Sequence, residues 1–194
     1  RDTPNFGLFA LEVDSLRTEL LCEDFASINF PSYAPDGKSI VFGRYGFHWT
    51  RPRYVGSAAA QIWLLKVDNH ERRALTDDGH QHLWTQFMPD GKHLLTVTAS
   101  EQTPSTSKLG ESIGKFQDNP QRTPNLWEYD LELKSKKELT KLSGDNVVFP
   151  CISRDGGVLV FRQQFDLYRM NPGAKEPPRK IDIWHNRDRL SGGK

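Results

Sequence analysis

Pro35-Asp36-Gly37-Lys38, followed by the apolar run Ile40-Val41-Phe42, decides the fold because the same stretch returns twice in the chain. The second copy is Pro89-Asp90-Gly91-Lys92 before residues 94–97, and a degenerate third copy, residues 154–157, precedes 158–161. An Asp-Gly pair between apolar segments is the strongest short-range signal of a β-hairpin. Each copy therefore predicts two antiparallel strands joined by this turn.

An aromatic residue in an apolar segment follows each turn, and Leu-Thr closes the first two copies. The aromatic residues Trp63, Trp127 and Tyr168 share one register, and Phe9 fits it as part of an earlier, incomplete unit. Four short strands, repeated, are typical of the blades of a β-propeller. We therefore expect an all-β fold, a partial β-propeller of four-stranded antiparallel blades from a six- or seven-bladed parent, with these aromatic side chains packed between blades.

The predicted strands follow from the repeat. They span 29–33, 39–44, 61–67 and 72–75, then 82–87, 93–97, 125–131 and 136–139, then 147–152, 158–162, 165–170 and a weak last strand at 179–183. The second strand of each unit is almost continuously apolar, which predicts that both of its faces are covered. The predicted divisions are 1–28 (closing half of a preceding blade), 29–78 (blade with insertion 45–60), 79–142 (blade with insertion 98–124), 143–183 (short blade) and 184–194 (tail or start of the next blade).

Composition narrows the function classes. The net charge of +1 and the mixed charges of the 194 residues do not indicate a nucleic-acid partner, and no apolar run reaches the length of a membrane span. Cys22 and Cys151 have no metal-type spacing, so two separate, mostly buried thiols are expected. Because the chain starts in the middle of a repeat, we expect it to be a piece of a longer protein.

The two insertions are the best candidates for a binding site. In a four-stranded meander, the loop after the second strand and the connection to the next blade leave from the same end, so both insertions gather on one rim beside residues 77–82. Long loops on a rigid scaffold often carry function. The first insertion combines arginines with aromatic residues and holds no acid, which suits a carboxylate, a peptide terminus or a protein surface. The alternative is that these side chains only fill the groove above the neighbouring blade. The predicted ligand- or partner-binding residues are Arg44, His48, Trp49, Arg51, Arg53, Tyr54, His80 and His82.

No catalytic residue, metal or cofactor is predicted. His80 and His82 point to the same side of a strand, but no third metal ligand is evident, and hydrogen-bonded structural histidines are the alternative. The chain has no Gly-x-Ser-x-Gly motif. Residues 110–116 imitate a phosphate-binding loop, but one residue is missing between the glycines and Phe116 replaces the required hydroxyl.

The repeat Pro-Asp-Gly-Lys, Ile-Val-Phe, Gln-Ile-Trp and Leu-Thr-Asp resembles the propeller repeats of TolB and of tricorn-type serine peptidases, from about Gly7 to Ile183. Residues 49–63 resemble the long first-blade loop of tricorn-like propellers, which precede a separate peptidase domain. This resemblance implies a cytoplasmic location if the chain is tricorn-like and a periplasmic one if it is TolB-like. No catalytic residue is implied, because nothing in the chain matches the peptidase domain.

The expected function is that of a non-catalytic module that gates substrate or docks a peptide or protein for a tricorn-like serine peptidase. The expected partners are the rest of the parent propeller, a possible downstream peptidase domain, and a peptide or protein ligand. The alternatives are a TolB-like interaction propeller without peptidase activity and a propeller attached to another hydrolase. On its own, this piece is expected to be marginally stable, since an open arc leaves terminal blade faces uncovered.

Overall fold

The computed structural model describes residues 6–45, 51–99 and 123–183, and these residues form β-strands and turns without any helix. Each predicted strand is present, although the last one is shorter than predicted. Two further strands precede them. The strands are β1 (Phe6–Leu11), β2 (Thr18–Asp24), β3 (Ile28–Tyr33), β4 (Ser39–Arg44), β5 (Gln61–Lys66), β6 (Arg72–Ala74), β7 (Leu83–Phe87), β8 (His93–Ala99), β9 (Pro124–Asp130), β10 (Lys136–Glu138), β11 (Val147–Ile152), β12 (Leu159–Gln163), β13 (Asp166–Met170) and β14 (Arg179–Lys180).

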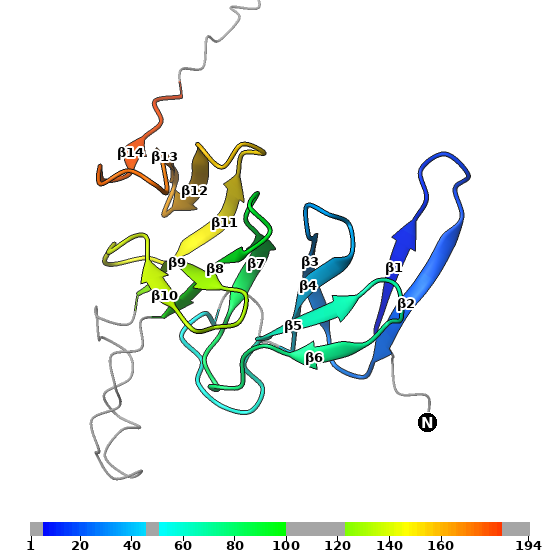
Figure 1. Ribbon diagram of the computed structural model, residues 1–194. Coiled ribbons are helices and arrows are strands. Elements are labelled where there is room, and N and C mark those ends of the chain that lie inside the picture. Colours follow the sequence, from blue (N-terminus) through cyan, green and yellow to red (C-terminus); the bar gives the residue numbers. More distant parts are fainter. Residues whose placement is uncertain (1–5, 46–50, 100–122, 184–194) are drawn as a thin grey trace, which may run out of the picture.

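The strands form three four-stranded antiparallel sheets, β3-β4-β5-β6, β7-β8-β9-β10 and β11-β12-β13-β14, and the two-stranded sheet β1-β2. In Figure 1 the sheets fan along an arc, with the strands β3, β7 and β11 toward its inside and β6, β10 and β14 toward its outside. Strand β7 contacts both β3 and β11. The fold is therefore a partial β-propeller of four-stranded blades, as the repeat predicts.

The three Asp-Gly turns have equivalent geometry. Gly37, Gly91 and Gly156 have φ angles of 71°, 66° and 75°, a backbone region that favours glycine. In the first turn, Asp36 Oδ1 accepts a hydrogen bond from the backbone N–H of Lys38 at 2.9 Å. The same bond is made by the aspartate of the other two turns, at 2.8 and 3.0 Å. The aspartates therefore stabilise their own turns.

The Leu-Thr pairs hold the outer strands of their sheets. Thr76 Oγ1 accepts a hydrogen bond from the backbone N–H of Ile62 at 2.9 Å, and Thr140 Oγ1 accepts one from Leu126 at 3.0 Å. The N–H of Leu75 donates to the carbonyl of Ile62 at 2.7 Å. Each threonine hydroxyl thus accepts a backbone N–H beyond the last residue that the outer strand pairs with. This satisfied N–H explains why the Leu-Thr pair recurs in the repeat.

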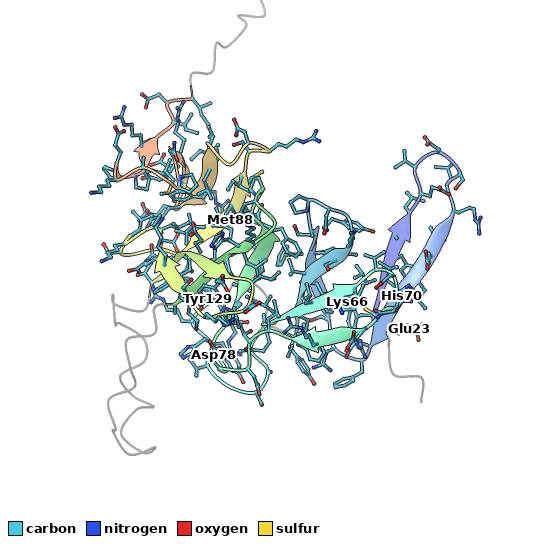
Figure 2. All side chains as sticks on the ribbon, viewed as in Figure 1. Glu23, Lys66, His70, Asp78, Met88 and Tyr129 are labelled. Carbon is cyan, nitrogen blue, oxygen red and sulfur yellow. The ribbon has the colours of Figure 1, made fainter. Side chains whose placement is uncertain are left out.

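Apolar cores fill the spaces between successive sheets. Strand β4 serves two of them, because Ile40 and Phe42 pack toward β1-β2 whereas Val41 packs toward the next sheet. Strand β8 divides in the same way, with Leu94 on one side and Leu95 on the other. Figure 2 labels Met88 and Tyr129, which belong to two of these cores. The prediction that the second strand of each unit is covered on both faces is confirmed for β4 and β8, whereas β12 contributes only Leu159 and Phe161 to a core.

Two sequence-based expectations are wrong. Trp63, Trp127 and Tyr168 pack against the cores as predicted, but Phe9 is 60% exposed, since no described residue covers that face of β1-β2. Cys151 is exposed rather than buried. It lies on β11, which pairs with β12 alone and whose register shifts between Val148 and Cys151.

Candidate binding rim

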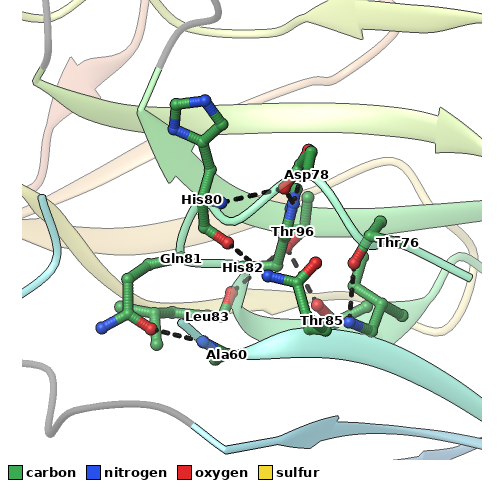
Figure 3. Close-up of polar contacts among 11 residues, drawn as sticks. Ala60, Thr76, Asp78, His80, Gln81, His82, Leu83, Thr85 and Thr96 are labelled. Carbon is green, nitrogen blue, oxygen red and sulfur yellow. Dashed lines mark hydrogen bonds and ion pairs between the residues drawn. The ribbon is translucent and has the colours of Figure 1, made fainter. Parts of the chain in front are cut away.

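The described part of the first insertion, residues 51–60, lies against residues 77–82, and these two segments are called the rim below. The backbone N–H of Gly56 donates to the carbonyl of Gly79 at 2.9 Å, and Val55 forms a β-bridge with His80. Gln81, which is 1% exposed, ties the segments together through its side chain. Its Oε1 accepts from the N–H of Ala60 at 2.7 Å (Figure 3). Its Nε2 donates to the carbonyl of Arg51 at 3.1 Å. The first insertion therefore lies on the predicted rim.

Under the rim, the buried side chain of His82 pairs with Asp78, whose side chain is 28% exposed. His82 Nε2 lies 3.0 Å and 3.1 Å from the two carboxylate oxygens of Asp78, and the His82 side chain is 1% exposed (Figure 3). The imidazole also meets the edge of the Tyr129 ring, with centroids 5.8 Å apart. The backbone N–H of His80 donates to Asp78 Oδ1 at 3.0 Å. One carboxylate thus fixes both histidines of the predicted pair.

The negative charge of Asp78 is stabilised by its hydrogen-bond partners. Burial alone would raise the pKa of this carboxyl, but the hydrogen bond and charge of His82 and the backbone N–H of His80 outweigh burial and hold the pKa well below its ordinary value. Asp78 is therefore ionised at any pH near neutrality. Because the carboxylate binds the imidazole, this arrangement matches the structural reading of the two histidines.

Replacing Asp78 with alanine is expected to lower the free energy of unfolding by about 1–3 kcal/mol, since it leaves the buried His82 ring nitrogen and the His80 N–H without their acceptor. Urea unfolding followed by fluorescence measures this loss. The matched control is Asp77→Ala, because Asp77 is the exposed neighbour in the same loop. Equal losses in the two variants would show that the His82 contact does not stabilise the rim.

The two arginines of the described insertion differ in burial, since Arg51 is exposed and Arg53 is half-buried. The Arg51 guanidinium lies 5.5 Å above the ring centroid of Tyr54. Arg53 Nη2 donates to the carbonyl of Gly144 at 2.9 Å, which links the insertion to the connection that precedes β11. The rim thus brings together Arg51, Arg53, Tyr54, His80 and His82 of the predicted binding residues.

Arg44 is the last residue of β4, and its side chain binds strand β2 instead of the rim. Its Nε and Nη2 donate to the two carboxylate oxygens of Asp24 at 2.7 and 2.9 Å, and Arg72 Nη1 donates to the same carboxylate at 3.0 Å. The Arg44 guanidinium also lies within 5.2 Å of the Phe25, Tyr45 and Trp63 ring centroids. This geometry makes Arg44 a clamp between the two-stranded sheet and its neighbour.

The remaining predicted binding residues, His48 and Trp49, lie outside the described residues, as do residues 100–122 of the second insertion. Within residues 6–45, 51–99 and 123–183, no three His, Cys, Asp or Glu side chains are grouped to hold a metal ion. In the same ranges no helix has the length and apolar character needed to cross a membrane.

Sequence reasoning did not single out three aromatic residues on the innermost strands. Phe30, Trp84 and Phe149 stand at the same offset before the aspartates of the three turns, and each has a positive φ, at 51°, 51° and 54°. That equal offset was the available signal. The positive φ angles change the direction of these side chains relative to the usual alternation along a strand. The sequence pattern does not predict such angles for aromatic residues.

Comparisons with known proteins identify the fold. No protein-family model and no curated protein matches the sequence. Among solved structures, the chain is similar to TolB from Acinetobacter baumannii, with 16% identity and a TM-score of 0.63 over 90% of this chain and 37% of TolB. It is also similar to an oligogalacturonate lyase from Vibrio parahaemolyticus, with 18% identity and a TM-score of 0.59 over 92% of this chain and 43% of the lyase.

A puromycin hydrolase mutant complexed with PGG is a third similar structure, with 15% identity and a TM-score of 0.56 over 86% of this chain and 24% of the hydrolase. This chain therefore spans less than half the length of each of these three proteins. At such identities the likeness shows the fold alone. A propeller module of the kind found in TolB and in peptidase-type hydrolases is the common feature.

Proposed function

We propose that this propeller segment docks a peptide or protein on its rim and gates substrate access for a serine peptidase of the tricorn-like kind to which its parent chain belongs. The observation that supports this most is the construction of the rim. An insertion with arginine and aromatic side chains is held to the blade by the backbone and side-chain bonds of Gly56, Ala60 and Gln81. Anchoring of this kind keeps the recognition groups in place, which lowers the entropy cost of binding.

Arginine and tyrosine are enriched at the residues that carry most of the binding energy in protein interfaces. The guanidinium of Arg51 lies over the Tyr54 ring and that of Arg53 bonds the carbonyl of Gly144, so the rim carries two cationic groups that an anionic partner would complement. The partner chemistry that fits is a peptide carboxylate or an acidic segment. The likeness to a puromycin hydrolase is consistent with a hydrolase domain in the parent chain.

Replacing both Arg51 and Arg53 with alanine is expected to weaken binding of a hexaglutamate peptide at least about tenfold, since each arginine offers a charge-assisted hydrogen bond. Fluorescence anisotropy of the labelled peptide measures the affinity. The control replaces Arg73 and Arg154, both exposed and away from the rim, and removes the same charge. If both double variants lose affinity equally, the binding is non-specific and the rim is not the docking site.

The peptidase part of the proposal has a test of its own. A fluorophosphonate probe, which labels the nucleophile of serine hydrolases, is expected to label the native parent protein and not the segment that ends at Lys194. A native parent that is folded and unlabelled favours the second candidate, an interaction propeller without peptidase activity. The similarity to TolB over 90% of this chain supports that candidate.

A further inference from the structure

The innermost strands carry a row of aromatic side chains that the rim does not use. Phe30, Trp84 and Phe149 lie on β3, β7 and β11, each at a register shift of its strand pair. The ring centroids of Phe30 and Trp84 are 5.5 Å apart, and those of Trp84 and Phe149 are 5.3 Å apart. These three residues therefore form a continuous ladder across three blades, and it is called the inner ladder below.

The inner ladder is not simply part of the cores. Trp84 is 6% exposed, but Phe30 is 41% exposed and Phe149 is 47% exposed. Bulges re-aim side chains, and residues held at positive φ without being glycine are concentrated at functional sites. The same unfavourable backbone state, repeated in three blades with aromatic side chains left at the surface, indicates a role other than packing.

Arg162 extends the ladder and supplies a positive charge. Its guanidinium carbon lies 5.2 Å from the Phe149 ring centroid, and no carboxylate of the described residues forms an ion pair with it. Its Nε is buried and has no hydrogen-bond partner. By contrast, the guanidinium of Arg44 also lies among aromatic rings, but it binds the two oxygens of Asp24. A buried, unpaired donor on a charged group is costly unless a ligand satisfies it.

A second unpaired donor lies in the ladder itself. Trp84 Nε1 is buried and has no partner either, although a buried indole N–H usually finds one. The ladder thus exposes the rings of Phe30 and Phe149 on either side of the buried Trp84, whose indole donor is unpaired. An unpaired cationic donor, Arg162 Nε, lies at the end beside Phe149. One cation beside an apolar surface suits a single negative charge on an apolar body, such as a carboxylate, better than it suits a doubly charged phosphate.

We propose that the inner ladder and Arg162 bind the C-terminus of a peptide whose last residue is apolar. The carboxylate pairs with the Arg162 guanidinium, and the apolar side chain lies on the exposed ring of Phe149, which packs against the buried Trp84. In a propeller the first strands of the blades line the central channel, so this site faces the channel rather than the rim. The site is separate from the docking rim and does not depend on it.

The test uses acetyl-alanyl-phenylalanine and its C-terminal amide as probes, with the indole resonances of the tryptophans followed by NMR. The free acid is expected to shift the Trp84 indole signal, and the amide is expected to bind at least about tenfold more weakly, because it lacks the charge that Arg162 pairs with. Equal binding of acid and amide by the wild-type protein would overturn the proposal. This comparison needs no variant, so it holds even if a substitution disturbs folding.

Arg162→Gln is expected to reduce the affinity for the acid to the level of the amide. The control is Arg154→Gln, because Arg154 is an exposed arginine in the turn of the same sheet, and it is expected to keep the wild-type affinity. Unchanged affinity in a folded Arg162→Gln protein would overturn the proposal. So would shifts from the acid that are confined to rim residues such as Tyr54 and leave Trp84 unmoved.

Discussion

Replacing Phe161 with alanine is expected to lower the free energy of unfolding by about 3–5 kcal/mol, the usual cost of removing a buried phenylalanine. Phe161 lies on β12, is 0% exposed, and stacks on Tyr168 with ring centroids 5.6 Å apart. It belongs to the core between the last two four-stranded sheets, together with Leu126 and Val147. The substitution therefore leaves a cavity between two blades, and neither sheet can fill it without moving relative to the other.

The matched control for this prediction is Phe165→Ala. Phe165 lies in the turn between β12 and β13 and is fully exposed. Its replacement removes the same atoms from the same hairpin and is expected to change stability by less than about 0.5 kcal/mol. Chemical denaturation of both variants gives the two values. Losses of similar size would mean that the sheets do not pack against each other as described.

Replacing Asp24 with alanine is expected to cost about 3–5 kcal/mol, the usual effect of removing one partner from a buried ion pair. The Asp24 side chain is 3% exposed and holds the guanidinium groups of Arg44 and Arg72 at 2.7 and 3.0 Å. Its Oδ1 also accepts the backbone N–H of Ala26 at 2.9 Å. Without Asp24, the Arg44 side chain, which is 15% exposed, is left as an uncompensated charge.

The pH dependence of stability distinguishes the loss of the Asp24 charge from a purely steric effect of the substitution. Hydrogen bonds from Arg44 lower the pKa of Asp24, burial opposes them, and the N–H of Ala26 adds to the lowering, so the pKa lies below its ordinary value. Asp24 therefore contributes fully above the unfolded pKa of about 4, and this contribution is lost as pH falls through its folded pKa. The stability gap between wild type and Asp24→Asn is expected to narrow in acid.

The exposed Asp14, in the loop between β1 and β2, provides the control for the Asp24 variants. Asp14→Ala is expected to unfold at the wild-type denaturant concentration across the same pH range. A constant gap between wild type and Asp24→Asn down to strongly acidic pH would contradict the role given to the ion pair.

The hairpins and the order of strands were predictable because their signals are local. An Asp-Gly pair needs only its own neighbours to make the turn, and the apolar run of β4 or β8 shows directly that both faces are covered. The rim followed from strand order, since a meander fixes which loops share an end. These features require no knowledge of which side chains meet in space.

Features that depend on contacts between sheets were not predictable. Arg44 was placed with the binding residues because its neighbours in sequence belong to the insertion, whereas its partner Asp24 lies on β2. The exposure of Phe9 depends on what covers the face of β1-β2, and the register alone does not report it. The position of Trp84 in the inner ladder depends on a positive φ at a register shift between β7 and β8. No residue type in the repeat predicts that shift.

The most direct test of the account is a nuclear Overhauser measurement on the isotope-labelled chain. Blades that stand side by side place the Trp84 ring 5.5 Å from Phe30 and 5.3 Å from Phe149, measured between centroids. Cross-peaks from the Trp84 indole protons to the ring protons of both phenylalanines are the expected result. Absence of both sets of cross-peaks in the folded chain, or sequential amide contacts typical of helix between Asp36 and Asp90, would contradict a propeller arc built from three equivalent blades.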